Sequence, residues 1–412
     1  AFGFAPSSSA ETCWRWTSNA TAGEPTWTEG GGVLSVPAFT GATAEDNVLE
    51  LLDDCKLERV LTFPKPCTIR TKRGLDAKKV LFASPDVHCL VGNAAVKAFN
   101  VTFDGKVGGE VVGNAAWGLK TNGVSLTLGD GVTVRNFKPA GRKINSNFDG
   151  AILIAAQTAT LDILEGAKIC DISGNGAAVT VCNGTTAVVN MSGGEITRCT
   201  SMAGNRGGGA ITIDSGTLNL SGGSIRGNTA SCGAGGICVV NDGRDGYVKV
   251  SGKPVVRDNV LLVRGKTATV ANVGLTDGRH GAGHFLLAGD LTAGAHVGCS
   301  HNVGAGKSFG AADGNCAGAE FIHADGNDTL AGQRAGQELR WVRSGKVDIS
   351  GCRVSVETLA CTGRVQSPRL TVEESAVGGA TLEKGVDYSI SGDTSAQKAG
   401  AYYLTLTGRG DY

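Results

Sequence analysis

The sequence predicts an all-β protein whose main part is a right-handed parallel β-helix, a solenoid in which short strands stack coil upon coil. Three observations predict this fold. Glycine supplies 64 of the 412 residues, about twice its usual share of about 7%, so the backbone must turn tightly and often. Apolar residues make up 41% of the chain and charged residues only 18%, which favours a large core over long charged helices. Apolar segments also recur at a regular period.

The repeat defines the coils. Four segments, starting at Gly150, Gly176, Gly208 and Gly235, each contain three short alternating apolar runs separated by turn residues. Equivalent apolar positions, about 27 to 30 residues apart, form two ladders: Ile163, Met191, Leu220 and Val250, and Ile169, Ile196, Ile225 and Val255. Three strands in such a period are typical of a parallel β-helix, where each coil buries its inward side chains by stacking on its neighbours. We expect the first ladder to be fully buried.

The N-terminal region precedes the coils. Residues 1–44 form a separate segment, and its first ten residues, AFGFAPSSSA, are typical of the tail of a secretory signal or, alternatively, of a frayed terminus. From Glu45 to Cys55, the sequence EDNVLELLDDC places its apolar residues on one side of a helix. We expect this helix to cap the open end of the first coil, where exposed strand edges would otherwise invite aggregation.

The β-helix is expected to span residues 45–345, and the pattern changes near Gly345. Residues 346–412 contain the strand-like runs VDISGCRVSVE, RLTVEE, DYSIS and AYYLTLTG, separated by turns. This arrangement suits a small Ig-like β-sandwich of about 65 residues.

Charge and cysteine content restrict the partners and the compartment. The 38 Lys and Arg residues balance 38 Asp and Glu residues, so the chain lacks the basic footprint of proteins that bind nucleic acid or anionic membranes. No apolar run approaches the roughly 18 to 20 residues of a membrane-spanning helix. Thirteen cysteines without any CxxC pair fit an oxidising compartment better than zinc binding. We expect an extracellular or surface-bound monomer without nucleic-acid partners or membrane insertion.

Two groups of motifs carry a family resemblance. The motif SGGSIRGNTA, followed by GGxxV, resembles the repeats of right-handed parallel β-helix proteins on bacterial cell surfaces. The segments ACTGRVQSPRLTV, LEKGVDYSIS and AGAYYLTLTGRGDY resemble the bacterial Ig-like modules that follow such repeats, with Cys361 where those modules usually have Tyr. The resemblance covers most of Glu45 to Tyr412 and implies export, often with a cell-wall anchor. Adhesins and polysaccharide-degrading enzymes share this coil, so the resemblance indicates a fold rather than an activity.

Local disulfides are expected from the cysteine spacing. The expected pairs are Cys352 with Cys361, Cys232 with Cys238, and Cys299 with Cys316. The departure from the family pattern at Cys361 also suggests the first pair. Cys170 and Cys199 lie in neighbouring coils but differ by two residues in register, which places their Cα atoms about 8 Å apart and beyond disulfide reach. We expect those two to stay unbridged.

Outward positions of the second strand are where a β-helix enzyme would carry its catalytic groove. They are Thr127, Asp162, Asn190, Asn219 and Lys249. A lyase needs several carboxylates around calcium and a base, and a glycosidase needs a carboxylate pair about 5 to 10 Å apart. This column offers one acid, Asp162, with Lys249 three rungs or about 14 Å away. We interpret the column as a solvated polar ladder, with a catalytic groove as the alternative.

The first-strand column and the turns add little chemistry. The outward first-strand positions Leu153, Thr180, Thr212 and Val239 are inert. Asp242 and Asp245 lie in the turn NDGRDG, where Asp side chains bond nearby backbone amides without any catalytic role. The basic run KPCTIRTKRGLDAKK, from Lys65 to Lys79, is interpreted as a solvated turn region rather than a binding patch.

Histidines and tryptophans provide two weaker candidates. A zinc set would comprise His280, His284, His296, Cys299 and His301. Glycine-rich segments do not fix these side chains on one face, so we expect no metal and no cofactor. Trp14, Trp16 and Trp27 cluster near the N-terminus, where we expect them to cover the base of the β-helix, with sugar stacking as the alternative.

Together these features predict a secreted or surface-displayed bacterial protein with a non-catalytic adhesion or structural role. Its partner would be a host or microbial glycan or a matrix protein. The alternative is a polysaccharide lyase or glycoside hydrolase acting in a groove of the β-helix. A cluster of two acids and one base on a single face would favour the enzyme.

Overall fold

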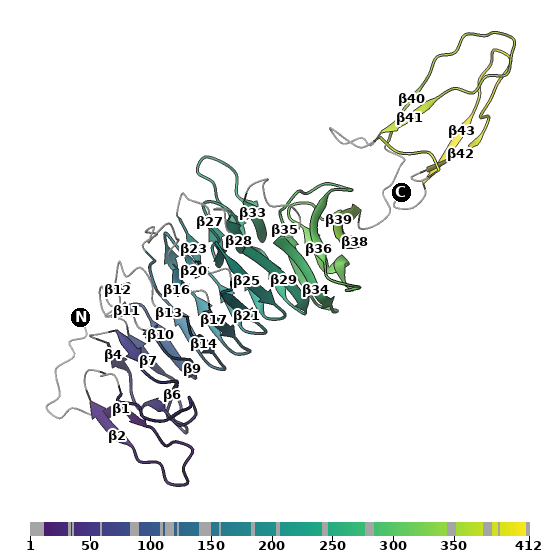
Figure 1. Cartoon of the computed structure of the whole chain (residues 1–412). Coiled ribbons are helices and arrows are strands. Elements are labelled where there is room, and N and C mark those ends of the chain that lie inside the picture. Colours follow the sequence, from purple (N-terminus) through teal and green to yellow (C-terminus); the bar gives the residue numbers. More distant parts are fainter. Residues whose placement is uncertain are drawn as a thin grey trace. The chain divides into compact units, whose positions relative to one another are not determined.

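The computed structural model describes residues 12–31, 34, 37–57, 60–82, 90–107, 110–111, 119–121, 123–139, 150–155, 158–182, 186–202, 207–240, 246–276, 284–343, 352–373, 381–385 and 388–408. Over these ranges the main part of the chain is a β-solenoid (Figure 1). The chain divides into two compact units, residues 1–327 with 332–341, and residues 328–331 with 342–412. Each is described by itself.

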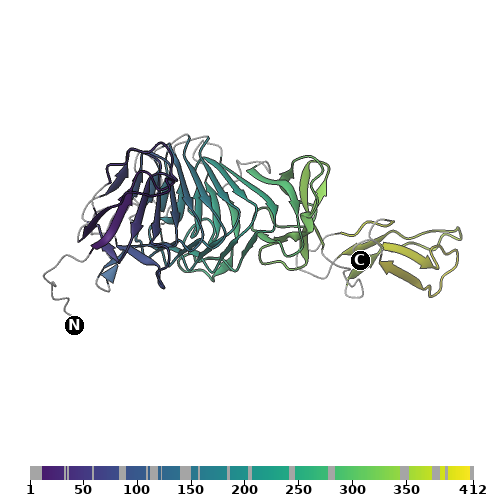
Figure 2. The ribbon, with the colours of Figure 1, turned by 90° about the horizontal axis from the view of Figure 1, so that it is seen from below.

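Three columns of parallel strands build the solenoid, and each complete coil contributes one strand to each column, while the first and last coils lack a first strand among the described residues (Figures 1 and 2). The first-strand column contains β5 (Leu61–Phe63), β8 (Leu90–Gly92), β13 (Leu119–Thr121), β16 (Gly150–Ile154), β20 (Ala177–Val181), β24 (Ile211–Ile213), β28 (Ile237–Val240) and β33 (Val273–Thr276). The second-strand column contains β3 (Val48–Leu51), β6 (Cys67–Thr71), β9 (Val96–Phe99), β14 (Ser125–Leu128), β17 (Thr160–Ile163), β21 (Val188–Met191), β25 (Gly216–Leu220), β29 (Gly246–Gly252), β34 (Phe285–Leu291) and β36 (Ser308–Ala312). The third-strand column contains β4 (Cys55–Lys56), β7 (Lys79–Phe82), β10 (Val101–Asp104), β15 (Thr133–Arg135), β18 (Lys168–Cys170), β22 (Glu195–Thr197), β26 (Ser224–Arg226), β30 (Val255–Arg257), β35 (His296–Cys299) and β37 (Ile322–Ala324).

Shorter elements complete this unit. A fourth, short column contains β19 (Ser173–Gly174), β23 (Thr200–Ser201), β27 (Thr229–Ala230), β31 (Val260–Leu261) and, antiparallel to the last, β32 (Thr269–Val270). The others are β1 (Thr12–Thr17), β2 (Thr28–Gly31), β11 (Lys106–Val107), β12 (Glu110–Val111), the 3₁₀ helix η2 (Ala319–Phe321), β38 (Leu330–Ala335) and β39 (Glu338–Arg343).

The predicted inward ladder is confirmed. Ile163, Met191, Leu220 and Val250 face one another in successive coils and are at most 1% exposed. The second ladder holds from Ile169 to Ile225 and then continues at Val256 rather than Val255. The error of one residue arises because the turn after Val250 is one residue longer than the turn after Leu220.

The glycine content follows from one turn that every coil repeats. Gly166, Gly194 and Gly223 occupy equivalent places between the second and third strands, with φ of 78°, 74° and 74°. Only glycine adopts this left-handed conformation at no steric cost. A Cβ at Gly223 would also lie 2.4 Å from the carbonyl oxygen of Gly193 in the coil below. The turn therefore needs glycine for its conformation and for the close stacking of coils.

The predicted cap helix at Glu45–Cys55 is wrong, and the described residues contain no α-helix. Residues Val48–Leu51 instead form β3, which pairs antiparallel with β1 and parallel with β6. Both faces of β3 are buried, and Glu50 is neutralised by Arg15 at 2.5 Å and by Arg70 at 2.8 Å. These two arginines come from other strands, so the local sequence does not show that Glu50 is buried. In the local pattern, Glu50 therefore resembles a residue on the polar side of a helix.

Aromatic residues close the N-terminal end in place of a helix. The ring of Phe39 lies between Trp16 and the fully buried Phe63, with centroid distances of 5.6 and 5.8 Å. Trp14 is buried against Gly30, and the Arg15 guanidinium stacks over Trp27 at 3.9 Å. All three tryptophans thus take part in these contacts at the N-terminal end of the solenoid, where the sequence interpretation places them.

The last coils close on a second aromatic stack. Trp341 is fully buried and stacks on Phe309 at a centroid distance of 3.9 Å, and Phe309 contacts Phe285 at 6.0 Å. The indole nitrogen of Trp341 donates to the carbonyl oxygen of His301. Strand β39 pairs antiparallel with β36, which ends the parallel stacking of the second column.

A buried ladder of amides follows the third strands. The Asn259 side-chain oxygen accepts the backbone N–H of Asn228 at 3.1 Å and its side-chain N–H at 2.9 Å. Asn272 accepts the same two bonds from Asn259. The ladder ends on Asp325, whose two oxygens accept the backbone and side-chain N–H groups of Asn272 at 2.7 and 2.6 Å. It thereby satisfies the backbone N–H groups of Asn228, Asn259 and Asn272.

Replacing Asp325 by Asn should remove a pH dependence of stability. Burial raises the pKa of Asp325 above its usual 3.8, against the hydrogen bonds from Asn272. The Asp325 carboxyl group therefore binds its proton more tightly in the folded chain than in the unfolded chain. Protonation stabilises the fold fully below pH 3.8, and this stabilisation is lost as the pH rises through the raised pKa. An Asn oxygen can accept both bonds, as in the other rungs. The Tm of Asp325→Asn relative to wild type should rise with pH across this window; a constant difference would refute the assignment.

The second unit contains two antiparallel strand pairs among its described residues. Strand β40 (Arg353–Val356) pairs with β41 (Leu370–Glu373), and β42 (Tyr388–Gly392) pairs with β43 (Leu404–Gly408). Its small core comprises Val372, Leu382 and Tyr388, with Cys352, Ile390 and Leu406 packed against it. The Ig-like topology stays a prediction.

Candidate functional site

The outward side of the second-strand column is a continuous polar ladder, as predicted. In register these residues are Lys97, Thr127, Asp162, Asn190, Asn219 and Lys249. Asn190 donates to Asp162 at 2.8 Å, and Asn219 donates to Asn190 at 2.8 Å. Thr127 completes the contact to Asp162 at 3.5 Å. Asp162 is therefore engaged from both sides.

The predicted separation of Asp162 and Lys249 is confirmed. Asn190 and Asn219 lie between them in register, so they are three rungs apart, or about 14 Å. They cannot share a proton or a substrate bond. The first-strand prediction needs one correction, because Cys238 rather than Val239 lies opposite Thr212.

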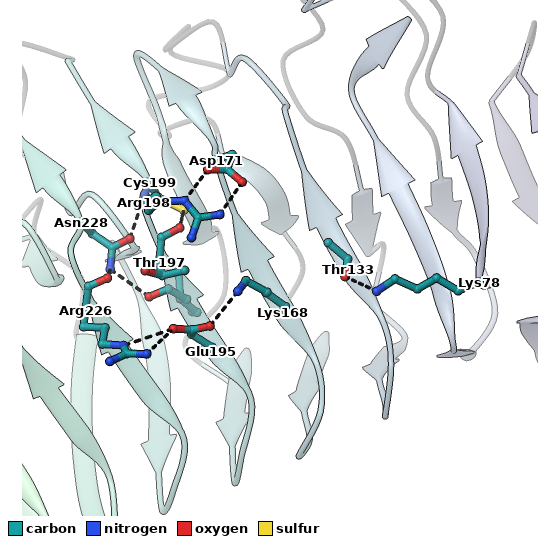
Figure 3. Close-up of polar contacts among 11 residues, drawn as sticks. Lys78, Thr133, Lys168, Asp171, Glu195, Thr197, Arg198, Cys199, Arg226 and Asn228 are labelled. Atoms are coloured by element: carbon teal, nitrogen blue, oxygen red, sulfur yellow. Dashed lines mark hydrogen bonds and ion pairs between the residues drawn. The ribbon is translucent and has the colours of Figure 1, made fainter. Parts of the chain in front are cut away.

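A charged ladder lies on the third-strand column (Figure 3). We define it as Asp104, Arg135, Lys168, Asp171, Glu195, Arg198 and Arg226. Arg198 forms a bidentate salt bridge with Asp171, in which both hydrogen bonds are 2.7 Å long. Glu195 lies between Lys168 at 3.0 Å and Arg226 at 3.1 Å. Arg135 contacts Asp104 at 2.7 Å. Each ion pair joins neighbouring coils.

The backbone places the pair of Asp171 and Arg198 at the end of the third strands. Asp171 and Arg198 follow β18 and β22 directly and adopt left-handed φ values of 56° and 54°. This conformation is unfavourable for a residue with a Cβ, and least so for Asp and Asn. Arg198 is the unusual occupant, and its side chain is 56% exposed. The strained turn thus projects a cation that stays open to solvent.

The electrostatics of the charged ladder do not suit acid catalysis. The hydrogen bond from Arg198 lowers the pKa of Asp171 below its usual value. At Glu195, burial acts to raise the pKa, but the hydrogen bonds from Lys168 and Arg226 outweigh burial and lower the pKa below its usual value. A glycosidase acid requires a raised pKa. These carboxylates are therefore held ionised, as acceptors for their cationic neighbours.

Lys78, whose ammonium reaches the third-strand column, has a lowered pKa. It donates to Thr133 at 2.6 Å and to the carbonyl oxygen of Gly131 at 3.1 Å. Desolvation, followed by the charge of Arg135, lowers its pKa. A lowered lysine pKa is a property of a lyase base.

The structure does not gather the proposed zinc set. The Nδ1 atom of His284 donates to the carbonyl oxygen of Gly246, and the ring stacks on Tyr247 at a centroid distance of 5.0 Å. His296 stacks instead on His323 at 4.2 Å. Burial lowers the pKa of His301. Within the described ranges, no three His, Cys, Asp or Glu side chains could hold one ion.

None of the expected disulfides forms. The predictions that Cys352 pairs with Cys361, Cys232 with Cys238, and Cys299 with Cys316 are wrong, because no disulfide joins any described cysteine. Cys299 is buried inside its coil, where desolvation raises the thiol pKa to about 12, whereas the Cys316 thiol donates to Asp313 in a surface turn. Proximity in sequence therefore does not bring these side chains together.

In each of the other two predicted pairs, one cysteine packs in a core and the other is more exposed. Cys238 packs in a buried cluster with Ala234 and Val240, whereas Cys232 is only half-buried. Cys352 packs on the core of the second unit, whereas Cys361 is exposed. These thiols serve as small apolar side chains or lie at the surface.

The predicted offset of Cys170 and Cys199 is confirmed. Cys170 lies opposite Thr197, two residues before Cys199. No disulfide joins them. Three other candidates, Asp242, Asp245 and His280, lie outside the described residues.

The charged ladder is the feature that sequence reasoning missed. Its signal was present, because Lys168 and Glu195 directly precede the aligned ladder residues Ile169 and Ile196. Extending the alignment by one residue on either side would have found alternating charges. The predicted outward columns comprised first-strand and second-strand residues and no third-strand residue.

Comparison with protein-family models, with curated proteins and with solved structures gives no match to this sequence. In the described part of the chain, no helix has the length and hydropathy needed to cross a membrane. The site must therefore be interpreted from its own chemistry.

Proposed function

We propose that this chain is a non-catalytic adhesion or structural module of a secreted or surface-displayed bacterial protein, which holds an extended glycan or a matrix protein against the outer face of its coils. The observation that supports the proposal most is the pairing in the charged ladder. Asp171 and Glu195 are ionised and committed to cations of adjacent coils. The face offers donors and exposed charges, and these two carboxylates are not prepared to protonate a leaving group.

The geometry of the face suits an extended partner. Polar side chains repeat at the strand spacing of about 4.8 Å along two columns. Asn190 and Asn219 offer amides, and Arg198 and Arg226 offer guanidinium groups on side chains that are 56% and 52% exposed. Such a row matches a polymer that presents one acceptor after another. The resemblance to surface β-helix proteins supports export, and the Ig-like module would serve as a spacer.

The alternative is a polysaccharide lyase or glycoside hydrolase, and Lys78 favours the lyase. Its lowered pKa suits proton abstraction. A lyase would still need carboxylates free to bind calcium or other groups to neutralise the substrate acid. Asp171 and Glu195 are already paired, so we place binding ahead of catalysis.

The intact chain should bind on an array of glycans and matrix proteins, and raising the salt concentration should weaken that binding, because exposed charges are screened. Replacing Arg198 and Arg226 together by Gln should reduce the retained signal about tenfold. The matched control is Arg264→Gln with Lys266→Gln, which removes two charges from one exposed turn elsewhere in the same unit. No retention at low salt, or equal retention by both double variants, would refute the proposal.

A further inference from the structure

A hollow of about 650 Å³ opens on the outer face of the first coils. The side chains that matter most in its lining are Arg70, Lys72, Arg73, Leu75, Lys97 and Phe99. Arg70 lies opposite Phe99, and Thr68 lies opposite Lys97, so strands β6 and β9 form the floor. The turn that follows β6 forms a wall. The volume is that of a site for a small ligand.

The wall is held in place by Lys78. The turn runs from Lys72 to Lys78, and the Lys78 ammonium reaches Gly131 and Thr133, two coils further along the column. The turn is therefore anchored at both ends, by β6 and by these bonds. Asn100 and Asp130 also line the hollow.

Phe99 provides an aromatic surface. A Cβ at Gly129, in the next coil, would lie 2.2 Å from the Phe99 ring, so only glycine leaves room for the ring at that place. The phenyl group packs there on one side and is half-exposed toward the hollow. An aromatic face with a solvent-accessible side suits the apolar face of a sugar ring.

The charge in the hollow is positive and partly unmatched. Arg70 is paired with Glu50 at 2.8 Å, and Lys97 with Glu45 at 2.6 Å. Lys72 and Arg73 form no ion pair or side-chain hydrogen bond with any described residue. Lys72 and Arg73 therefore line the hollow without an ion-pair partner among the described residues. The carboxylates in the lining are Glu45, which is paired with Lys97, and Asp130.

From these contacts we infer that the hollow binds an anionic sugar unit, a pyranose ring that carries a carboxylate or a sulfate. The ring packs on Phe99, and the anionic group is bound by Lys72 and by the Arg73 guanidinium, whose two N–H groups suit paired acceptor oxygens. Asn100 and Asp130 are placed to bond hydroxyl groups. The inference names a ligand class at one end of the proposed binding face and so rests on the proposed function.

The hollow also joins the polar ladder. Lys97 lines the hollow and is followed in register by Thr127 and then Asp162. A chain bound at the hollow can thus continue along the outer face of the coils. The proposed site departs from the interpretation of Lys65–Lys79 as a solvated turn, because Lys97 and Phe99 from the next coil complete its lining.

Isothermal titration of the intact chain tests the inference with four probes: tetragalacturonate, its neutral methyl-esterified form, a sulfated carrageenan tetrasaccharide and inorganic sulfate. We expect at least one anionic tetrasaccharide to bind and the neutral one not to bind. Which of the two binds distinguishes a carboxylate site from a sulfate site. Lys72→Gln with Arg73→Gln should weaken that binding by at least about tenfold.

The variant Phe99→Leu tests the contribution of the aromatic ring to tetrasaccharide binding separately from the contribution of the charged groups. It should weaken tetrasaccharide binding several-fold while leaving the response to inorganic sulfate unchanged. The matched control, Arg264→Gln with Lys266→Gln, should bind as wild type does. Equal affinity in the Lys72 and Arg73 variant would overturn the inference. If neither anionic tetrasaccharide binds while the array still retains a glycan or protein, the inference fails and the proposed function stands.

Discussion

Replacing Leu220 by Asp should unfold the central coils. Leu220 lies between Met191 and Val250 in the inward ladder and is 1% exposed. A carboxylate at that position would be buried among apolar side chains without a cation, at a cost of more than about 4 kcal/mol. Each coil of a solenoid is stabilised by its neighbours, so the loss should spread first to β21 and β29. Hydrogen exchange of the amides in these strands measures it.

The control for Leu220→Asp is Ser221→Asp. Ser221 is the next residue and is exposed, so the same carboxylate enters water at no burial cost. The control should keep the wild-type Tm and the wild-type protection. If Leu220→Asp also kept its Tm, the inward register of the ladder would be refuted.

Asn259→Leu should cost almost as much, about 3 to 5 kcal/mol. The Asn259 side chain accepts two bonds from Asn228 and donates to Asn272 and to the carbonyl oxygens of Ile225 and Arg257. Leucine has a similar volume but satisfies none of these groups, which are buried except for the part-buried bond to Arg257. Denaturant unfolding measures the loss.

Asn219→Leu is the matched comparison for Asn259→Leu. Asn219 lies in the outward polar ladder, is half-buried and donates to Asn190. Water can replace that partner, so the loss should stay below about 1 kcal/mol. Equal losses in the two variants would show that the buried amide ladder does not stabilise the coils.

The periodic part of the fold could be predicted from the sequence. Ile163, Met191 and Leu220 recur because every coil must bury one apolar residue at that place, and this spacing alone fixes the register. The ends could not be predicted in the same way. At β3, Glu50 is buried only because Arg15 and Arg70 reach it from other strands, and neither contact is visible in a local pattern.

The candidate site shows the same division. The polar ladder around Asp162 follows from the repeat and was predicted. The hollow at Phe99 depends on Gly129 and on the anchored turn after β6, which belong to different coils and to an irregular loop. The disulfide prediction failed because closeness in sequence says nothing about which way two side chains point in a coil.

The most direct test of the account is the chain length of a polysaccharide that the protein has bound. The glycan retained on the array, incubated with the intact chain and calcium, should be recovered with its length distribution and reducing ends unchanged. That result is predicted because Asp171 and Glu195 are held ionised by bonded cations. Shortened chains, with activity lost in Lys78→Met, would contradict a non-catalytic role and identify a lyase or glycosidase.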